Sequence, residues 1–393
     1  MKRKVDILGL LLVALLMTAC SGGGDDGENT SVTDQQPVLT FYVYAPERPM
    51  ITRANEVNAT AEENAIHNMQ IWVFETGTNT KVGYLAPTSF PTTAEGRVYQ
   101  MNVSKEFANA ATKPNVDVYV VANGRSKTTL NGSTTRAELE DAVMGETDFG
   151  VSSPREGVPE GGLPMTGVLR DKAIGGENPV LRVVEDEDGG NMAKVRLLRM
   201  VSKVRYVFCK GVSDELPING ITIGADLIPT TEYLFLTENN NYRIGNDYVS
   251  SVTSLITTET EVPDVLECGN PTKYDINKIP HSLTAQEYED LIDLGVKGDT
   301  ENNIDPDLTL AGPFYFKESD KKLSGTITYT PPGETVSKDI PYSMKADDAN
   351  SSFTRNHSWI VYAYYEGLSG MQIIVVDVTP WEETEENHSV YNW

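Results

Sequence analysis

Alternation of apolar and polar side chains is the feature of this chain that most limits its fold. Residues 39–44, 116–121 and 325–329 place apolar side chains at every second position. That period puts neighbouring side chains on opposite faces of a strand, whereas an amphipathic helix repeats every three or four residues. The sequence therefore predicts a mainly β protein, with clusters of Gly, Asn, Asp and Pro between many of the strands.

The predicted strands cover residues 39–44, 69–74, 98–103, 116–121, 195–208, 220–223, 233–236, 313–316, 325–329, 358–365 and 371–378. Two short helices are also predicted, because Thr135 precedes Glu138 and Thr284 precedes Glu287 with the spacing of a capping box. A length of 393 residues suits two domains better than one. We place their boundary in the acidic, glycine-rich run 185–191, which gives an N-terminal domain at 37–190 and a C-terminal domain at 191–393.

The first twenty residues predict export. A basic start at 2–4 and an apolar run at 7–16 lead into Met17-Thr18-Ala19-Cys20. The run is shorter than the roughly 20 residues that a membrane-spanning helix needs, and its small-residue exit is typical of a cleavable signal. We interpret residues 1–19 as a lipoprotein signal peptide, in which Met17 stands where leucine is usual, and Cys20 as the residue that receives the lipid. Residues 20–36 follow as a flexible, glycine-rich tether.

The net charge limits the partners that this chain can have. Its 57 acidic and 32 basic side chains give a formal net charge of -25. A surface of that sign repels phosphate, so nucleic acid and anionic lipid headgroups are poor partners.

Cys209 and Cys268 are the two cysteines that remain after Cys20. An exported chain could oxidise them to a disulfide, and the alternative is two separate buried thiols. The residues leave both alternatives open.

Signatures of catalysis or metal binding are missing from the sequence. None of the four histidines lies in an HExxH or a Cys-His pattern, and the Ser319 to Lys322 spacing has no companion motif. The acidic runs lack the spacing of a calcium loop. We therefore predict no catalytic residue, no metal site, no cofactor and no enzyme activity. Trp359 and Trp381 belong to an aromatic set that suits core packing better than a carbohydrate platform.

Several segments in order resemble the fimbrillin family of Bacteroidales, the subunits of lipoprotein-derived (type V) pili. They are residues 39–44 followed by Arg53 and 69–74, then 116–123 with the Thr135 helix, then 162–167 and 195–204, and finally 355–362 leading to 378–381. The resemblance implies two tandem transthyretin-like β-sandwich domains. It also implies that the lipid carries the precursor to the outer membrane, that an Arg-specific protease removes the first strand, and that a donor strand from another subunit replaces it.

Two arginines are candidates for that cleavage. Arg48 precedes Pro49, whose ring hinders most protease binding modes, whereas Arg53 is followed by Ala54 and Asn55. We therefore predict Arg53 as the site of proteolytic maturation.

The family's donor strand is C-terminal, and here residues 371–378 and the tail 387–393 are both available. The predicted function is a structural subunit of a surface-exposed fimbrium that supports adhesion, with copies of itself or related pilus subunits as partners and with an unknown receptor. The alternatives are a surface glycan-binding lipoprotein, a tip or anchor adhesin that is not a stalk polymer, and a lipid-anchored hydrolase with an unrecognised carboxylate pair.

Overall fold

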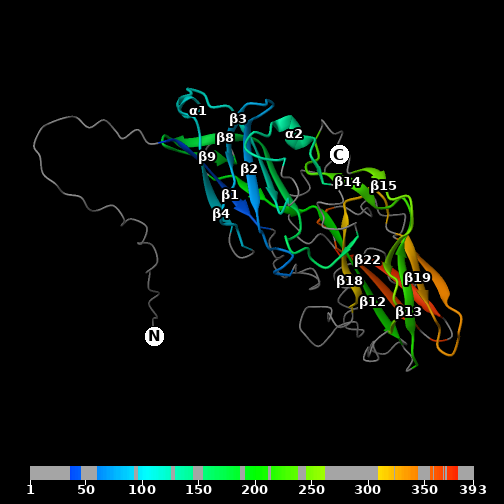
Figure 1. The fold of residues 1–393 in the computed structure, drawn as a ribbon. Helices are drawn as coiled ribbons and strands as arrows, with labels where there is room; N and C mark the ends of the chain where they lie inside the picture. The colour runs from blue at the N-terminus through cyan, green and yellow to red at the C-terminus, as the bar shows by residue number, and fades with distance from the viewer. Residues whose placement is uncertain are drawn as a thin grey trace, which may run out of the picture. The chain divides into compact units, whose positions relative to one another are not determined.

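The computed structural model describes residues 36–45, 60–92, 96–124, 129–144, 154–185, 191–210, 214–237, 245–261, 309–322, 324–343, 355–356, 358–365, 367 and 370–378. Strands dominate these residues, and two helices of five residues each accompany them, as Figure 1 shows. The prediction of a mainly β protein is confirmed. The tandem transthyretin-like arrangement stays a prediction.

One group of strands includes the first described residues of the chain. Its sheet runs in the order β10-β1-β9-β8-β5-β2-β3, with β4 paired to β1 and β11 paired to β8. The strands are β1 Val38–Tyr44, β2 Met69–Glu75, β3 Lys81–Leu85, β4 Arg97–Asn102, β5 Val116–Ala122, β8 Met165–Glu177, β9 Val180–Val184, β10 Lys194–Arg196 and β11 Leu198–Arg199. The long strand β8 pairs with β5 through its first part and with β9 through its last part. It therefore joins the strands around β1 to those around β2.

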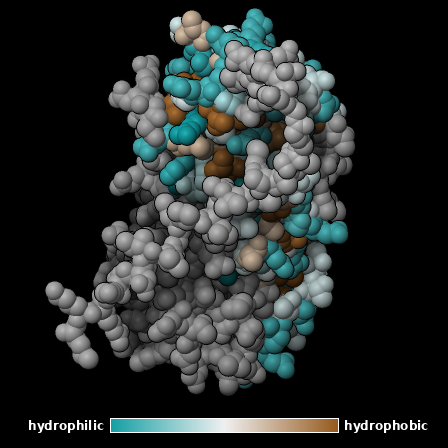
Figure 2. All heavy atoms as spheres, turned by 90° about the vertical axis from the view of Figure 1, so that its left-hand side faces the viewer, coloured by the Kyte–Doolittle hydropathy of each residue, from teal (hydrophilic) through white to brown (hydrophobic). Residues whose placement is uncertain are grey.

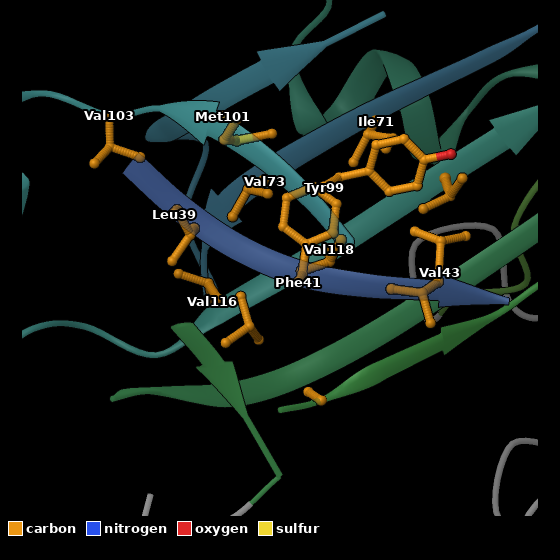
Figure 3. Close-up of a cluster of buried hydrophobic side chains, with 14 of the residues drawn as sticks. Leu39, Phe41, Val43, Ile71, Val73, Tyr99, Met101, Val103, Val116 and Val118 are labelled. Atoms are coloured by element: carbon orange, nitrogen blue, oxygen red, sulfur yellow. The ribbon is translucent and has the colours of Figure 1, made fainter. Parts of the chain in front are cut away.

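A hydrophobic core lies between these two sets of strands. Side chains from β1, β4 and β9 share one cluster with side chains from β2 and β5, and Figure 3 shows part of it. The two sets therefore pack face to face, as the sheets of a β-sandwich do.

The second face of β2 and β5 has its own core. Trp72, Phe74 and Tyr119 lie there with Leu139 of helix α2 (Arg136–Glu140). The predicted capping box is present, because the Thr135 hydroxyl accepts from the Glu138 N–H while the Glu138 carboxylate accepts from the Thr135 N–H. Helix α1 (Lys105–Asn109), capped by Ser104, was not predicted.

The remaining strands form three sheets. One has the order β22-β21-β12-β18-β7, one has the order β16-β13-β19-β20 with β17 on β13, and one has the order β15-β14-β6. Their strands are β6 Val143–Met144, β7 Arg155–Glu156, β12 Val201–Lys210, β13 Pro217–Ile223, β14 Pro229–Tyr233, β15 Gly245–Tyr248, β16 Thr253–Ile256, β17 Thr260–Glu261, β18 Thr309–Lys317, β19 Ser324–Tyr329, β20 Lys338–Ser343, β21 Ser358–Tyr365 and β22 Met371–Val378. Side chains of both five-stranded sheets share one hydrophobic cluster, so these two sheets also pack face to face.

Two predicted strands differ from the structure. Residues 195–208 were predicted as one strand, but the chain here forms β10, β11 and β12. β10 pairs with β1, β11 pairs with β8, and β12 lies between β18 and β21. Residues 233–236 are strand only at Tyr233. The carbonyls of Tyr233 and Leu234 accept hydrogen bonds from Arg355, so a neighbouring strand does not take them.

The predicted helix after Thr284 lies outside the described residues. Sheet pairing with N-terminal strands continues to Arg199, past the predicted boundary at 190/191, and the domain limits stay a prediction. Within the described parts of the chain, no helix is long and apolar enough to cross a membrane. Figure 2 shows a face on which hydrophobic side chains appear in patches among hydrophilic ones.

Candidate functional site

Strand β1 is held on both of its edges. It runs antiparallel to β4, with Val38 opposite Asn102 and Val43 opposite Arg97. On the other edge it runs parallel to β9 through residues 38–40 and parallel to β10 through residues 42–44. Among the described strands β4 has no other partner than β1. We call this position, between β4 on one side and β9 and β10 on the other, the β1 site.

One face of β1 is completely buried. Leu39, Phe41 and Val43 each have 0% of their surface exposed, and Figure 3 shows them within the core cluster. The ring of Phe41 stacks on that of Tyr99 with centroids 6.3 Å apart. Burying one such side chain stabilises the fold by about 1.5–3 kcal/mol, so this face accounts for about 5–9 kcal/mol.

The other face of β1 is partly open to solvent. The Thr40 hydroxyl donates to the Leu181 carbonyl at 2.8 Å, and Thr40 is 3% exposed. Tyr42 and Tyr44, two residues apart on this face, are half-buried with ring centroids 4.5 Å apart. The strand therefore makes specific contacts through both faces, which is typical of a strand inside a sheet.

The chain resumes after residues 46–59 with a tightly bound turn at residues 60–64. The Glu63 carboxylate accepts from the Thr60 N–H at 2.7 Å, and the Glu63 N–H donates to the Thr60 hydroxyl at 3.1 Å. The same carboxylate accepts from the Tyr315 hydroxyl at 2.6 Å and pairs with the Lys203 ammonium at 2.8 Å. Glu63 is 1% exposed, so a buried ion pair to β12 and a buried hydrogen bond from β18 fix this turn.

Arg199 extends this buried network. Its guanidinium donates to the Glu63 carbonyl at 3.3 Å, to the Asn356 side-chain oxygen at 2.9 Å and to the Asn64 side-chain oxygen. Arg199 is 0% exposed. The turn at 60–64 thus has its own anchor, which does not depend on the contacts of β1.

Electrostatics of the turn favour an ionised Glu63. Burial alone would raise the pKa of this carboxyl, but the Lys203 charge and hydrogen bonds from Lys203, Tyr315 and Thr60 bring the pKa below its usual value. In the same contact, burial and the Glu63 charge raise the pKa of Tyr315, so its hydroxyl stays protonated and donates.

The hydrolase alternative requires two acids that face each other in a cleft. Glu232 and Glu318 are the candidates for such a pair. Both contact Arg355, Glu318 at 2.7 Å and Glu232 at 3.4 Å. Burial raises the pKa of Glu232 well above its usual value. With 0% and 1% exposure, however, neither carboxyl lies in a cleft where a substrate could reach it, so the pair gives that alternative no support.

Ser319, the first residue of the SxxK spacing, is 1% exposed. Its hydroxyl donates to the Leu227 carbonyl at 2.7 Å and accepts from the Lys321 N–H at 3.1 Å. These bonds fix a turn and give Ser319 no role as a nucleophile. The described residues also hold no group of three or more His, Cys, Asp or Glu that could bind a metal ion.

Most of the predicted site residues lie outside the described part of the chain: Cys20, Arg48, Arg53, Cys268, Trp381 and the tail 387–393. Cys209 lies in β12, and its pairing with Cys268 stays a prediction. Trp359 is 3% exposed within the core of β12, β18 and β21. The glycan-binding alternative needed an exposed Trp359 or Trp381, and Trp359 does not meet it.

The sequence did not reveal the network around Glu63. Arg199, Lys203 and Tyr315 follow Glu63 by more than 130 residues, so no local pattern connects them. One signal was available, because Thr60 and Glu63 have the same spacing as the capping box at Thr135.

Comparison with known proteins tests the predicted family resemblance. Residues 39–191 match the family model described as major fimbrial subunit protein (FimA). The match includes β1 and most of the strands that pack around it. The predicted resemblance to the fimbrillin family is therefore confirmed over residues 39–191 of the 393 in the chain. No curated protein matches the sequence.

Solved structures that are similar come from Porphyromonas, Parabacteroides and Bacteroides species. The tip fimbrial protein Mfa3 from Porphyromonas gingivalis is 14% identical, with a TM-score of 0.45, and the match covers 87% of this chain and 100% of that one. A cell adhesion protein from Parabacteroides distasonis is 14% identical, with a TM-score of 0.48 and coverages of 88% and 98%. Another from Bacteroides eggerthii is 14% identical, with a TM-score of 0.47 and coverages of 89% and 97%.

Proposed function

We propose that this protein is a structural, non-enzymatic subunit of a cell-surface pilus that polymerises by exchange of strand β1. Proteolysis at Arg53 separates β1 from the rest of the chain, and a strand from another subunit then occupies the β1 site. The observation that carries the proposal is that β1 pairs on both edges and buries a whole face, and that the proposed cut lies between β1 and the separately anchored turn at residues 60–64.

Loss of β1 would leave the β1 site in a state that favours the binding of another strand. It would remove the only described partner of β4 and open the core around Tyr99 to water. Unpaired backbone groups at a sheet edge and exposed apolar side chains both favour the addition of a strand. Ladder hydrogen bonds supply general affinity for an incoming strand, and the side-chain positions select among strands.

The anchor at residues 60–64 supports the order of these events. A cut after Arg53 leaves six residues, 54–59, before Thr60, where the buried contacts of Glu63 and Arg199 begin. The new N-terminus therefore stays attached to the fold while β1 departs.

Export as a lipoprotein completes the proposal. Cys20 carries the lipid that holds the precursor at the outer membrane, and cleavage at Arg53 releases the mature subunit from that lipid. The partners are copies of this chain or related pilus subunits and an Arg-specific protease, with no cofactor.

Strand β22 is a donor candidate because of its place in its sheet. It ends the order β22-β21-β12-β18-β7 and pairs with β21 alone among the described strands. It can leave by breaking one ladder, whereas a central strand would have to break two. The tail 387–393 is the second candidate.

Electron microscopy of cells that carry single arginine substitutions tests the proposal. We expect Arg53→Ala to abolish surface filaments and to leave the chain cell-attached, because β1 is then never released. Arg48→Ala is the matched control and keeps normal filaments. Filaments of normal length with Arg53→Ala would contradict the proposed cleavage. Wild-type protein found only at filament ends would favour the tip or anchor alternative.

A further inference from the structure

A side chain on the outward face of β1 packs against a glycine, Gly96. Tyr42 stands opposite Val98 of β4, and the Tyr42 ring extends diagonally over Gly96, two residues earlier on the same face. A Cβ atom at Gly96 would overlap the ring of Tyr42 and come within 2.8 Å of its hydroxyl oxygen. With the ring where it lies, glycine fits this position, and a side chain there would force the ring of Tyr42 to move.

Tyr44 has a partner on the opposite edge of the strand. The ammonium nitrogen of Lys194 in β10 lies 5.6 Å from the centroid of the Tyr44 ring, within the range of a cation–π contact. A hydrogen bond with Tyr44 raises the pKa of Lys194, which keeps the ammonium charged.

Exposed apolar side chains continue this outward face. Val98 of β4 is 48% exposed and Val180 of β9 is 40% exposed, and these are two of the four large apolar residues with exposed surface in the described parts of the chain. Val98 lies opposite Tyr42, and Val180 lies opposite Val38. Residues opposite one another share a face of the sheet, so apolar surface flanks both ends of the outward face of β1.

From these contacts we infer that the β1 site selects its occupant through the outward face as well as the buried one, with Gly96 and Lys194 as the specificity-determining residues. The inference rests on the proposed strand exchange. The partner it defines is a strand that presents apolar side chains at the positions of Leu39, Phe41 and Val43 and aromatic side chains at the positions of Tyr42 and Tyr44.

Neither C-terminal candidate of this chain has both features. Residues 371–377 fit the buried face with Met371, Ile373 and Val375, but they place aliphatic side chains where the tyrosines are. The tail has Tyr391 and Trp393 two residues apart, but the intervening register puts histidine and asparagine on the buried face. The preferred occupant therefore comes from a related subunit with a different sequence, and another copy of this chain binds more weakly.

A peptide-exchange assay on the full chain, nicked at Arg53 with an Arg-specific protease, tests the inference. Fluorescent peptides compete for the β1 site: residues 36–46, the same peptide with Tyr42→Ala and Tyr44→Ala, residues 370–378 and residues 386–393. We expect the doubly substituted peptide to bind about tenfold more weakly than the native one, from the loss of two aromatic contacts. Both C-terminal peptides are expected to bind more weakly than the native peptide as well.

Protein variants separate specific recognition from general loss of apolar area. With Gly96→Ala, the native peptide loses its advantage over the Tyr42→Ala peptide, because the added methyl group occupies the place of the ring. Gly220→Ala, a glycine-to-alanine change in β13 where the added Cβ would meet no atom closer than 3.6 Å, is the matched control and keeps the wild-type ranking.

Two results have different meanings. Equal binding of native and doubly substituted peptides to the wild-type protein would overturn the inference and leave strand exchange intact. A nicked protein that exchanges none of the peptides, including its own β1 sequence, would contradict the proposed function itself.

Discussion

Two buried glutamates of this protein should respond in opposite ways to the same substitution. Glu63 and Glu232 are 1% and 0% exposed. The pKa of Glu63 is lowered from its ordinary value of 4.5. The Lys203 charge and hydrogen bonds from Lys203, Tyr315 and Thr60 together outweigh the effect of burial. The pKa of Glu232 is raised well above 4.5, chiefly by burial. Glutamine keeps the size of either side chain and removes its charge.

Glu63→Gln should therefore be strongly destabilising at neutral pH. The change leaves the Lys203 ammonium buried without its opposite charge, and breaking one partner of a buried pair costs about 3–5 kcal/mol. Glu232→Gln resembles the protonated form that burial already favours, so we expect a loss below about 1 kcal/mol, or a gain.

The pH dependence separates the two effects further. A carboxyl with a lowered folded pKa contributes stability above pH 4.5, and this is lost as pH falls through the folded pKa. The deficit of Glu63→Gln relative to wild type should therefore shrink below pH 4.5. A raised folded pKa costs the wild type stability as pH rises above 4.5, so Glu232→Gln should gain relative to wild type in that direction.

Urea denaturation followed by tryptophan fluorescence, from about pH 3 to pH 8, measures both differences. Equal losses for the two variants at pH 7 would refute the reasoning. So would a deficit of Glu63→Gln that grows as the pH falls, because an ionised Glu63 could not then be the stabilising form.

Three further substitutions test the local structure by the same urea assay. Phe41→Ala should cost about 3–5 kcal/mol in the uncut protein, because it empties a fully buried site; a loss below 1 kcal/mol would mean that β1 is loosely held. Thr135→Ala should cost about 1 kcal/mol through the lost helix cap, with no effect on strand exchange. Asn123→Ala should cost about 2–3 kcal/mol, because Asn123 has a φ of 57° and its amide donates to the carbonyls of Ala65 and Leu163; an unchanged stability would show that these bonds contribute nothing.

Strands with one buried face could be predicted from the sequence. In residues 39–44 the apolar side chains alternate because one face meets the core, and β1 follows that pattern with only a one-residue difference at its start. The helix at Thr135 was predictable for a similarly local reason, since both partners of its capping box lie within four residues.

Strands that change surroundings along their length could not be predicted in this way. β8 is buried at Met165 to Gly167 and increasingly exposed afterwards, as it passes from β5 to β9, so no single period describes it. The apolar run 195–208 had the opposite problem. Its uniform pattern hides two changes of pairing partner, which the tertiary fold decides.

The candidate site was predictable in part. The alternation in residues 39–44 predicted a strand, and the structure places this strand, β1, between strands on both edges. The buried contacts of Glu63 and the contact of Gly96 with the Tyr42 ring depend on residues that the fold brings together. A glycine in a loop before a strand gives no sign in the sequence that a tyrosine ring will cover it.

The central claim is that β1 is removed when the subunit enters a filament. Isolated filaments can be dissociated and their subunit analysed by N-terminal sequencing and intact mass. The account predicts a mature chain that begins at Ala54 and filaments that have lost the peptide Val38–Tyr44. A subunit that begins at lipidated Cys20 and retains that peptide would contradict it.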